Sequence, residues 1–218
     1  MENILVAGAT GTTGNIIVNL LKESNKYTPI AMVRKEEQRA DFEAKGIKTI
    51  LANLESDLSG IADGADRVIF AAGSGGNNVE GVDRDGAIKL VKASEKASVK
   101  KFVMLSSINA DQPESSDELE EYLKAKKEAD AYLRQSNLPY TIVRPGSLTN
   151  DKATGKIKWE EKLSTMGEVD RADVAKVLVG CLDDQVATRT TFEFIKGEKE
   201  IEQALREIPS SKTEPNFA

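Results

Sequence analysis

Three glycines spaced three residues apart lie near the start of this chain. They follow the apolar run 4–7 and precede the apolar stretch 16–21, an order that indicates a strand, a tight turn and a helix. The N–H groups and positive dipole end of such a helix favour an anion, as in sites that hold a dinucleotide pyrophosphate. The spacing is GxxGxxG instead of the more familiar GxGxxG. The sequence therefore predicts a dinucleotide-binding loop made of Gly8, Thr10, Gly11, Thr12, Thr13 and Gly14.

A basic residue stands where NAD-binding proteins of this type carry an acid. Arg34 directly follows the apolar run 30–33 and comes 20 residues after Gly14. An Asp or Glu at about that distance bonds the ribose 2′-hydroxyl of NAD, whereas a guanidinium group can bind the 2′-phosphate of NADP with two hydrogen bonds. We therefore expect NADP(H) to be preferred over NAD(H), with Lys35 and Arg39 adding positive charge. A surface charge at a strand end is the alternative interpretation.

Small and polar residues follow the next two apolar runs. Asn53 and Leu54 come after the run 47–51, where a short polar side chain can reach the adenine edge. Ala71 and Ala72 end the run 67–72 and Gly73 follows it, and such small side chains let a ribose pass close to the backbone. Because ligands of open α/β sheets bind at the carboxyl ends of the strands, both segments are candidate cofactor contacts. A tight turn rich in glycine gives the same pattern at 73–76.

A tyrosine and a lysine are placed for proton chemistry. Tyr122 and Lys126 are four residues apart in the predicted helix 117–136, so their side chains share one face. A nearby ammonium group lowers the pKa of a tyrosine, which can then exchange a proton with a carbonyl or an alcohol. Ser106 and Ser107 end the apolar run 102–105 and can orient the same oxygen. The alternative is a half-buried tyrosine beside a solvated lysine.

The composition excludes several kinds of chemistry. The chain of 218 residues has no histidine and one cysteine, so histidine catalysis, a Cys-rich zinc site and an internal disulfide are excluded, and we expect no metal site. Cys181 lies in an apolar helical run and is predicted to be a buried thiol. A net charge of −6 argues against nucleic acid or acidic membranes as partners. With no long apolar segment and no signal-peptide pattern after Met1, we expect a cytoplasmic protein.

Strand-like and helical segments alternate along most of the chain. The expected strands are uniformly apolar, which is typical of a parallel sheet that is buried on both faces. The pattern predicts a doubly wound α/β fold with three layers, in one domain over residues 1–207 followed by a tail over 208–218. The expected strands are 4–7, 30–33, 47–51, 67–72, 102–105, 140–143 and 191–195, and the expected helices are 14–24, 36–45, 81–98, 117–136 and 171–183.

Five segments together resemble the short-chain dehydrogenase/reductase superfamily over about residues 3–200. The similarity is greatest to its atypical members, which include NAD(P)-dependent epimerase/dehydratases and are related to NmrA-like and flavin/biliverdin reductase-like proteins. The glycine loop and the segment ending in Arg144-Pro145-Gly146 are the more specific matches. The resemblance implies a Rossmann fold with bound NADP. Its matching segments are 8–14, 82–86, 102–107, 140–146 and 171–175.

The resemblance also implies roles for individual residues. Ser107, Tyr122 and Lys126 would form the catalytic set, and Lys126 would also bond the nicotinamide ribose. Ser106, Pro145 and Gly146 would lie beside the cofactor, whereas Arg144 would tie the sixth strand to neighbouring loops. Asp83 takes the place of the family's active-site Asn, which departs from the usual proton relay.

These observations predict an NADP(H)-dependent oxidoreductase. Because only a short part of the chain follows Pro145, we expect an open site and hydride transfer to or from a small carbonyl, a quinone or a flavin-like acceptor. The alternative is an NADP(H)-binding sensor or regulatory partner protein without turnover, and epimerisation or dehydration is less favoured. We expect a small-molecule substrate, near Ile108, Asn109 and Leu148, and leave monomer and homodimer open.

Overall fold

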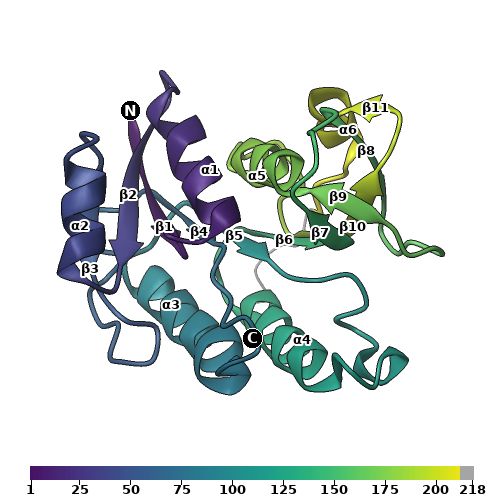
Figure 1. Ribbon diagram of the computed structural model, residues 1–218, viewed down its shortest axis with the longest axis horizontal. Coiled ribbons are helices and arrows are strands. Elements are labelled where there is room, and N and C mark those ends of the chain that lie inside the picture. Colours follow the sequence, from purple (N-terminus) through teal and green to yellow (C-terminus); the bar gives the residue numbers. More distant parts are fainter. Residues whose placement is uncertain (212–218) are drawn as a thin grey trace.

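A nine-stranded sheet lies at the centre of the computed structural model, which describes residues 1–211 (Figure 1). Its strand order is β11-β8-β10-β6-β5-β4-β1-β2-β3. Neighbours from β10 to β3 run parallel, whereas β8 is antiparallel to both β10 and β11. The predicted doubly wound α/β fold is confirmed. The strands are β1 (Glu2–Ala7), β2 (Tyr27–Val33), β3 (Lys48–Leu51), β4 (Arg67–Phe70), β5 (Lys101–Leu105), β6 (Tyr140–Pro145), β8 (Lys156–Glu160), β10 (Thr190–Lys196) and β11 (Lys199–Glu200).

Helices cover both faces of the sheet (Figure 1). On one face, the helices α1 (Thr12–Lys22), α2 (Glu36–Glu43) and α5 (Arg171–Gly180) pack apolar side chains against the strands. On the other face, α3 (Asp85–Lys96) and α4 (Glu120–Gln135) do the same. In these helices the buried residues recur at helical spacing on the side that faces the sheet, as Ile17, Val18 and Leu21 do in α1. Burial from both sides explains why the inner strands β4 and β5 are apolar after their first residues, Arg67 and Lys101.

Two buried cations hold the edge of the sheet that faces away from the strands' carboxyl ends. Arg67 begins β4 and donates hydrogen bonds to Glu2 and to Asp184. Lys101 begins β5, and its Nζ donates to the carbonyl oxygens of Asp183 and Val186 at 2.6 and 2.7 Å. Burial lowers the pKa of Lys101 to about 8. These contacts attach the turn after α5 to the first residues of β4 and β5.

Several short elements were not predicted. The expected helix 81–98 is two elements, the π-helix η1 (Val79–Arg84) and α3, because a wider turn precedes the regular helix. The other unpredicted elements are two to seven residues long and carry polar residues that hide their pattern. Besides β8 and β11 they are β7 (Ser147–Thr149), which pairs with β9 (Glu168–Asp170), the 3-10 turn η2 (Pro113–Ser115) and α6 (Ile201–Glu207).

The predicted tail begins as a packed segment. Ile208 is 3% exposed, and the Ser211 N–H donates to the Thr188 carbonyl at 2.9 Å. Residues 212–218 of the predicted tail lie outside the described part of the chain. Within residues 1–211, no helix is long and apolar enough to span a membrane.

The single cysteine is buried, as predicted. Cys181 is fully buried after α5, and burial raises the pKa of its thiol from 9.0 to about 12. Its thiolate population is therefore about a thousandfold smaller than that of an exposed thiol. We expect Cys181 to react far more slowly with Ellman's reagent in the native protein than after denaturation. The variant Thr165→Cys adds an exposed thiol as a control, and native-state labelling of Cys181 at the rate of that thiol would contradict the burial.

Candidate functional site

The glycine loop brings two strands and a helix into close contact. Gly8 follows β1 with φ +85°, and a Cβ on it would lie 2.6 Å from the backbone N and Cα of Ala72. A Cβ on Gly14 would overlap the carbonyl oxygen of Gly8. That carbonyl accepts the Gly11 N–H at 3.0 Å, and Gly11 is the N-cap residue of α1. Because Gly11 has no side chain, the first N–H groups of α1 are open to a ligand.

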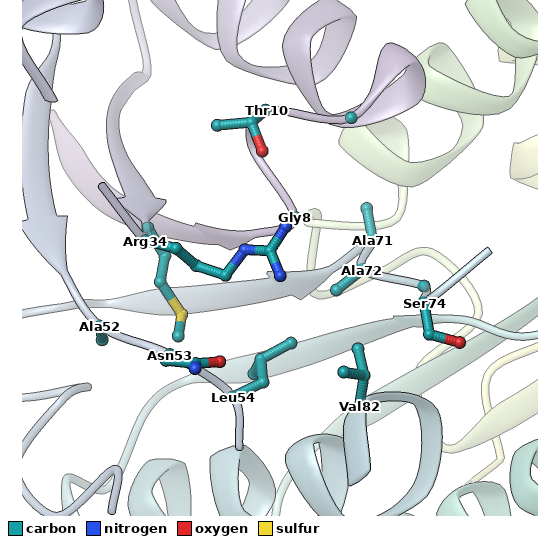
Figure 2. Close-up of a pocket in the computed structure, with 13 residues that line it drawn as sticks. Gly8, Thr10, Arg34, Ala52, Asn53, Leu54, Ala71, Ala72, Ser74 and Val82 are labelled. Carbon is teal, nitrogen blue, oxygen red and sulfur yellow. The ribbon is translucent and has the colours of Figure 1, made fainter. Parts of the chain in front are cut away.

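A cavity of about 340 Å³ lies in front of this loop at the carboxyl ends of β1, β2, β3 and β4 (Figure 2). The loop supplies one wall, the segment after β3 a second, and the segment after β4 a third. Val82 of η1 adds an apolar side chain at the end nearer α4. The lining residues are Gly8, Thr10, Gly11, Met32, Arg34, Ala52, Asn53, Leu54, Ala71, Ala72, Gly73, Ser74 and Val82.

Arg34 is the charged side chain of this lining. Figure 2 shows its guanidinium group extending into the space between Gly8 and Asn53. The Arg34 backbone N–H donates to Gln38 Oε1 at 3.0 Å, which fixes the turn from β2 into α2. Asn53 Oδ1 accepts the Glu55 N–H at 3.1 Å, so the NH₂ group of Asn53 is the donor it can offer a ligand. A cation, helix N–H groups and a neutral amide suit a nucleotide with phosphates.

Other predicted cofactor contacts lie outside the cavity. Arg39 is turned along α2, where its Nε donates to Glu43 Oε1 at 2.9 Å, and Glu36 lies 3.8 Å away. Gly14 supports the loop from within α1. Gly146 is buried, and a Cβ on it would overlap the Gly167 carbonyl. The predicted contacts that are not among the cavity-lining residues of the described chain are Thr12, Thr13, Gly14, Lys35, Arg39, Ser106, Lys126, Pro145 and Gly146.

Ser106, a predicted cofactor contact, is buried in a polar cluster beneath the end of β5. It is 3% exposed, and its hydroxyl donates to Asp130 Oδ2 at 2.9 Å. The guanidinium of Arg144 donates to the same oxygen at 2.9 and 3.1 Å and to Asp111 at 3.0 Å. Burial raises the pKa of Asp130 despite these partners. Arg144 thus ties β6 to α4 and to the loop after β5, as expected.

Lys126, predicted to act in catalysis and to bond the ribose, is buried as well. It is 2% exposed, and its Nζ lies 3.3 Å from Asp83 Oδ1 and donates to the Leu105 carbonyl at 3.4 Å. The ammonium group lies 5.5 Å from the centre of the Tyr122 ring and 5.6 Å from that of Phe70. In this arrangement Lys126 faces the interior and is not among the residues of 1–211 that line the cavity. Tyr122 and Lys126 share a helix face, as predicted, and the Lys126 ammonium group lies over the Tyr122 ring.

Ser107 and Tyr122 are half-buried near the carboxyl end of β5. The Ser107 hydroxyl donates to the Ile108 carbonyl at 3.3 Å, and Ile108 N–H donates to the Pro145 carbonyl at 3.0 Å. Asn109 has a φ of +62° and donates its side-chain amide to Met166 Sδ, which places the loop between β8 and β9 beside it. Of the other expected substrate contacts, Ile108 is buried and Leu148 is half-buried.

A buried carboxylate fixes this side of the site, and the sequence analysis did not identify it. Glu193 on β10 is fully buried and accepts the N–H groups of Asn109 at 3.3 Å and Leu163 at 2.8 Å. Lys162 lies 3.3 Å from the same carboxylate and 2.7 Å from Asp111. Glu193 thereby holds together the loops that follow β5 and β8. A glutamate amid Phe192 and Phe194 in an apolar strand is the sequence signal that could have revealed it.

Comparisons with known proteins agree with this geometry. A family model described as NAD(P)H-binding matches residues 8–185. The Bacillus subtilis (strain 168) protein named "Uncharacterized sugar epimerase YhfK" is 38% identical over 213 residues, which are 94% of this chain and 99% of that protein. A solved structure described as "Putative NAD-dependent epimerase/dehydratase from Bacillus halodurans" has a TM-score of 0.89 and 37% identity, covering 94% of this chain and 99% of the other. The "oxidoreductase ylbE" from Lactococcus lactis has a TM-score of 0.81 and 32% identity, with 93% and 94% covered.

Two glycine substitutions separate packing from binding. Gly14→Ala should reduce the free energy of unfolding by about 1–3 kcal/mol and weaken dinucleotide binding, because its Cβ would overlap the Gly8 carbonyl. Gly11→Ala should leave stability within about 1 kcal/mol of the wild type, because its Cβ would meet that oxygen at 3.4 Å. Its added methyl group should still weaken binding. Urea unfolding and dinucleotide titration check both, and a fully stable Gly14→Ala variant would contradict the packing argument.

Proposed function

This chain belongs to the NAD(P)H-binding family, and we propose that it is an NADP(H)-dependent oxidoreductase acting on a small or flat acceptor. The position of Arg34 in the cavity carries the choice of cofactor, and the similarity to an oxidoreductase from Lactococcus lactis supports the reaction class. When bound, the nicotinamide would supply or accept hydride. The candidate acceptors are a small carbonyl, a quinone or a flavin-like ring system.

Arg34 supports NADP(H) over NAD(H) because of its surroundings. It extends into the cavity, and the other lining residues within 1–211 include no acidic side chain. Glu36 lies 3.8 Å from the Arg39 guanidinium, which also binds Glu43, so these acids are engaged on α2. A 2′-phosphate beside Arg34 would gain charge-assisted hydrogen bonds, whereas a 2′-hydroxyl would gain much less.

Ser107 and Tyr122 are the groups that we propose for the acceptor side. The Tyr122 hydroxyl would donate a proton to a carbonyl oxygen, and the Ser107 hydroxyl would orient that oxygen by a hydrogen bond. Lys126 would hold its positive charge beside the Tyr122 ring from the protein interior. The exposed Met166 next to Asn109 would offer an apolar contact to a flat acceptor. Reduction of a quinone or flavin needs less help from a protein acid.

A second candidate is a protein that binds NADP(H) without turnover. The burial of Lys126 against Asp83 favours it, because the Asp83 carboxylate offsets the positive charge that the superfamily resemblance assigns to assisting the tyrosine. This candidate predicts different affinities for the oxidised and reduced dinucleotide and no consumption of NADPH with any acceptor.

The cofactor proposal is tested by calorimetric titration. The wild type should bind NADPH at least about tenfold more tightly than NADH, and Arg34→Ala should remove most of that difference. Arg39→Ala is the matched control, since its guanidinium lies outside the cavity on α2, where it pairs with Glu43, and it should keep the preference. Equal affinities of the wild type for the two dinucleotides would contradict the proposal that Arg34 binds the 2′-phosphate.

The reaction proposal is tested by NADPH consumption with carbonyls, quinones and flavins as acceptors. Tyr122→Phe should lower kcat for a carbonyl acceptor by about a hundredfold or more, because the proton donor is lost, and affect quinones and flavins far less. Tyr132→Phe is the control, as this half-buried tyrosine lies further along α4 beneath Lys92. Unchanged carbonyl turnover in Tyr122→Phe would remove Tyr122 from the mechanism.

A further inference from the structure

Asp83 and Lys126 form an ion pair inside the protein, behind the wall of the cavity. Asp83 is 1% exposed and Lys126 is 2% exposed, and Nζ lies 3.3 Å from Oδ1. Burial lowers the pKa of Lys126, but negative charge on the Tyr122 oxygen when it is ionised and on the Asp83 carboxylate outweighs it, so the pKa is raised overall. The Lys126 ammonium group therefore has a partner of opposite charge in an apolar setting.

The second oxygen of Asp83 reaches the cavity wall. Oδ2 accepts the backbone N–H of Ser74 at 3.0 Å, and a Cβ on Gly73 would lie 3.3 Å from Oδ1. Gly73 and Ser74 line the cavity at the end of β4. A carboxylate held by Lys126 from behind can therefore fix the backbone of this wall in one position.

Four elements of the fold converge on the pair. Asp83 belongs to the π-helix η1, whose wider turn precedes α3, and Lys126 belongs to α4. The Lys126 ammonium group also donates to the Leu105 carbonyl at the end of β5 and lies near the Phe70 ring at the end of β4. The pair thus links η1 and α4 to the ends of β4 and β5.

We propose that the Asp83–Lys126 ion pair is a positioning device that holds the Gly73–Ser74 wall in the conformation that binds the dinucleotide. Lys126 then influences the cofactor through Asp83 and this wall, without touching the ribose. This inference rests on the proposed function for its ligand. It differs from the role that the superfamily resemblance implies for Lys126, and the two roles predict opposite outcomes when both partners are replaced.

Four proteins test the proposal: the wild type, Asp83→Asn, Lys126→Met and the double variant. Each single variant leaves one buried charge without its partner, so its affinity for NADPH should fall at least about tenfold. In the double variant no charge is left, and the amide oxygen of the Asn side chain can still accept the Ser74 N–H. Its affinity should return to within about threefold of the wild type. A double variant that binds as weakly as Lys126→Met would overturn the proposal, because a contact between Lys126 and the cofactor cannot be restored by a change at Asp83.

Amide hydrogen exchange of the ligand-free proteins gives a second readout. Asp83→Asn and Lys126→Met should speed exchange at the Ser74 amide, while the Ala71 amide, which donates to the Ala7 carbonyl at 2.9 Å, keeps its protection. The double variant should recover slow exchange at Ser74. Unchanged exchange at Ser74, or equal acceleration at Ser74 and Ala71, would contradict a local positioning role.

This readout also separates the inference from the proposed function. If the wild type binds no dinucleotide, the proposed function fails, while exchange at Ser74 still decides whether the pair holds the wall. Lys124→Met is the matched control on α4, since Lys124 is exposed and pairs with Glu120, and it should change neither NADPH affinity nor exchange.

Discussion

The contact between the Gly8 backbone and the backbone of Ala71 and Ala72 is the constraint on which the site depends. A side chain at Gly8 would push β1 and β4 apart at their carboxyl ends, and one at Gly14 would push α1 away from the loop. Because both are glycines, the N-terminus of α1 opens at the same edge as the ends of β2, β3 and β4. The cavity is the space that this close packing leaves in front of the sheet.

Behind that edge, buried polar groups hold the loops in place. Asp83 binds the loop after β4, Asp130 binds the end of β5 and β6, and Glu193 binds the loops after β5 and β8. Each carboxylate accepts backbone or hydroxyl hydrogens and pairs with a cation, which offsets the cost of burying its charge. Residues expected at the cofactor, such as Ser106 and Lys126, belong to this supporting layer. The small residues that line the cavity are therefore held in place by buried polar groups behind them.

The sequence predicted the sheet and the cavity better than the supporting layer. Uniformly apolar runs and glycine spacing are local signals, and the rule that ligands lie at strand ends then identifies Arg34, Asn53 and Ala72 as lining residues. The short strand β8 has polar residues that mask its pattern. Helical spacing places Tyr122 and Lys126 on one face without saying that the lysine points inward. That depends on Asp83, which lies 43 residues earlier in the chain and meets it only through tertiary packing.

The central claim is that Arg34 recognises the 2′-phosphate of NADP at the end of β2. A crystal structure of the complex with NADP⁺ measures this directly, through the distance from the 2′-phosphate oxygens to the Arg34 guanidinium nitrogens. The account predicts distances within about 3.2 Å, with the pyrophosphate at the N-terminus of α1. A 2′-phosphate in solvent, or bound away from Arg34, would contradict it.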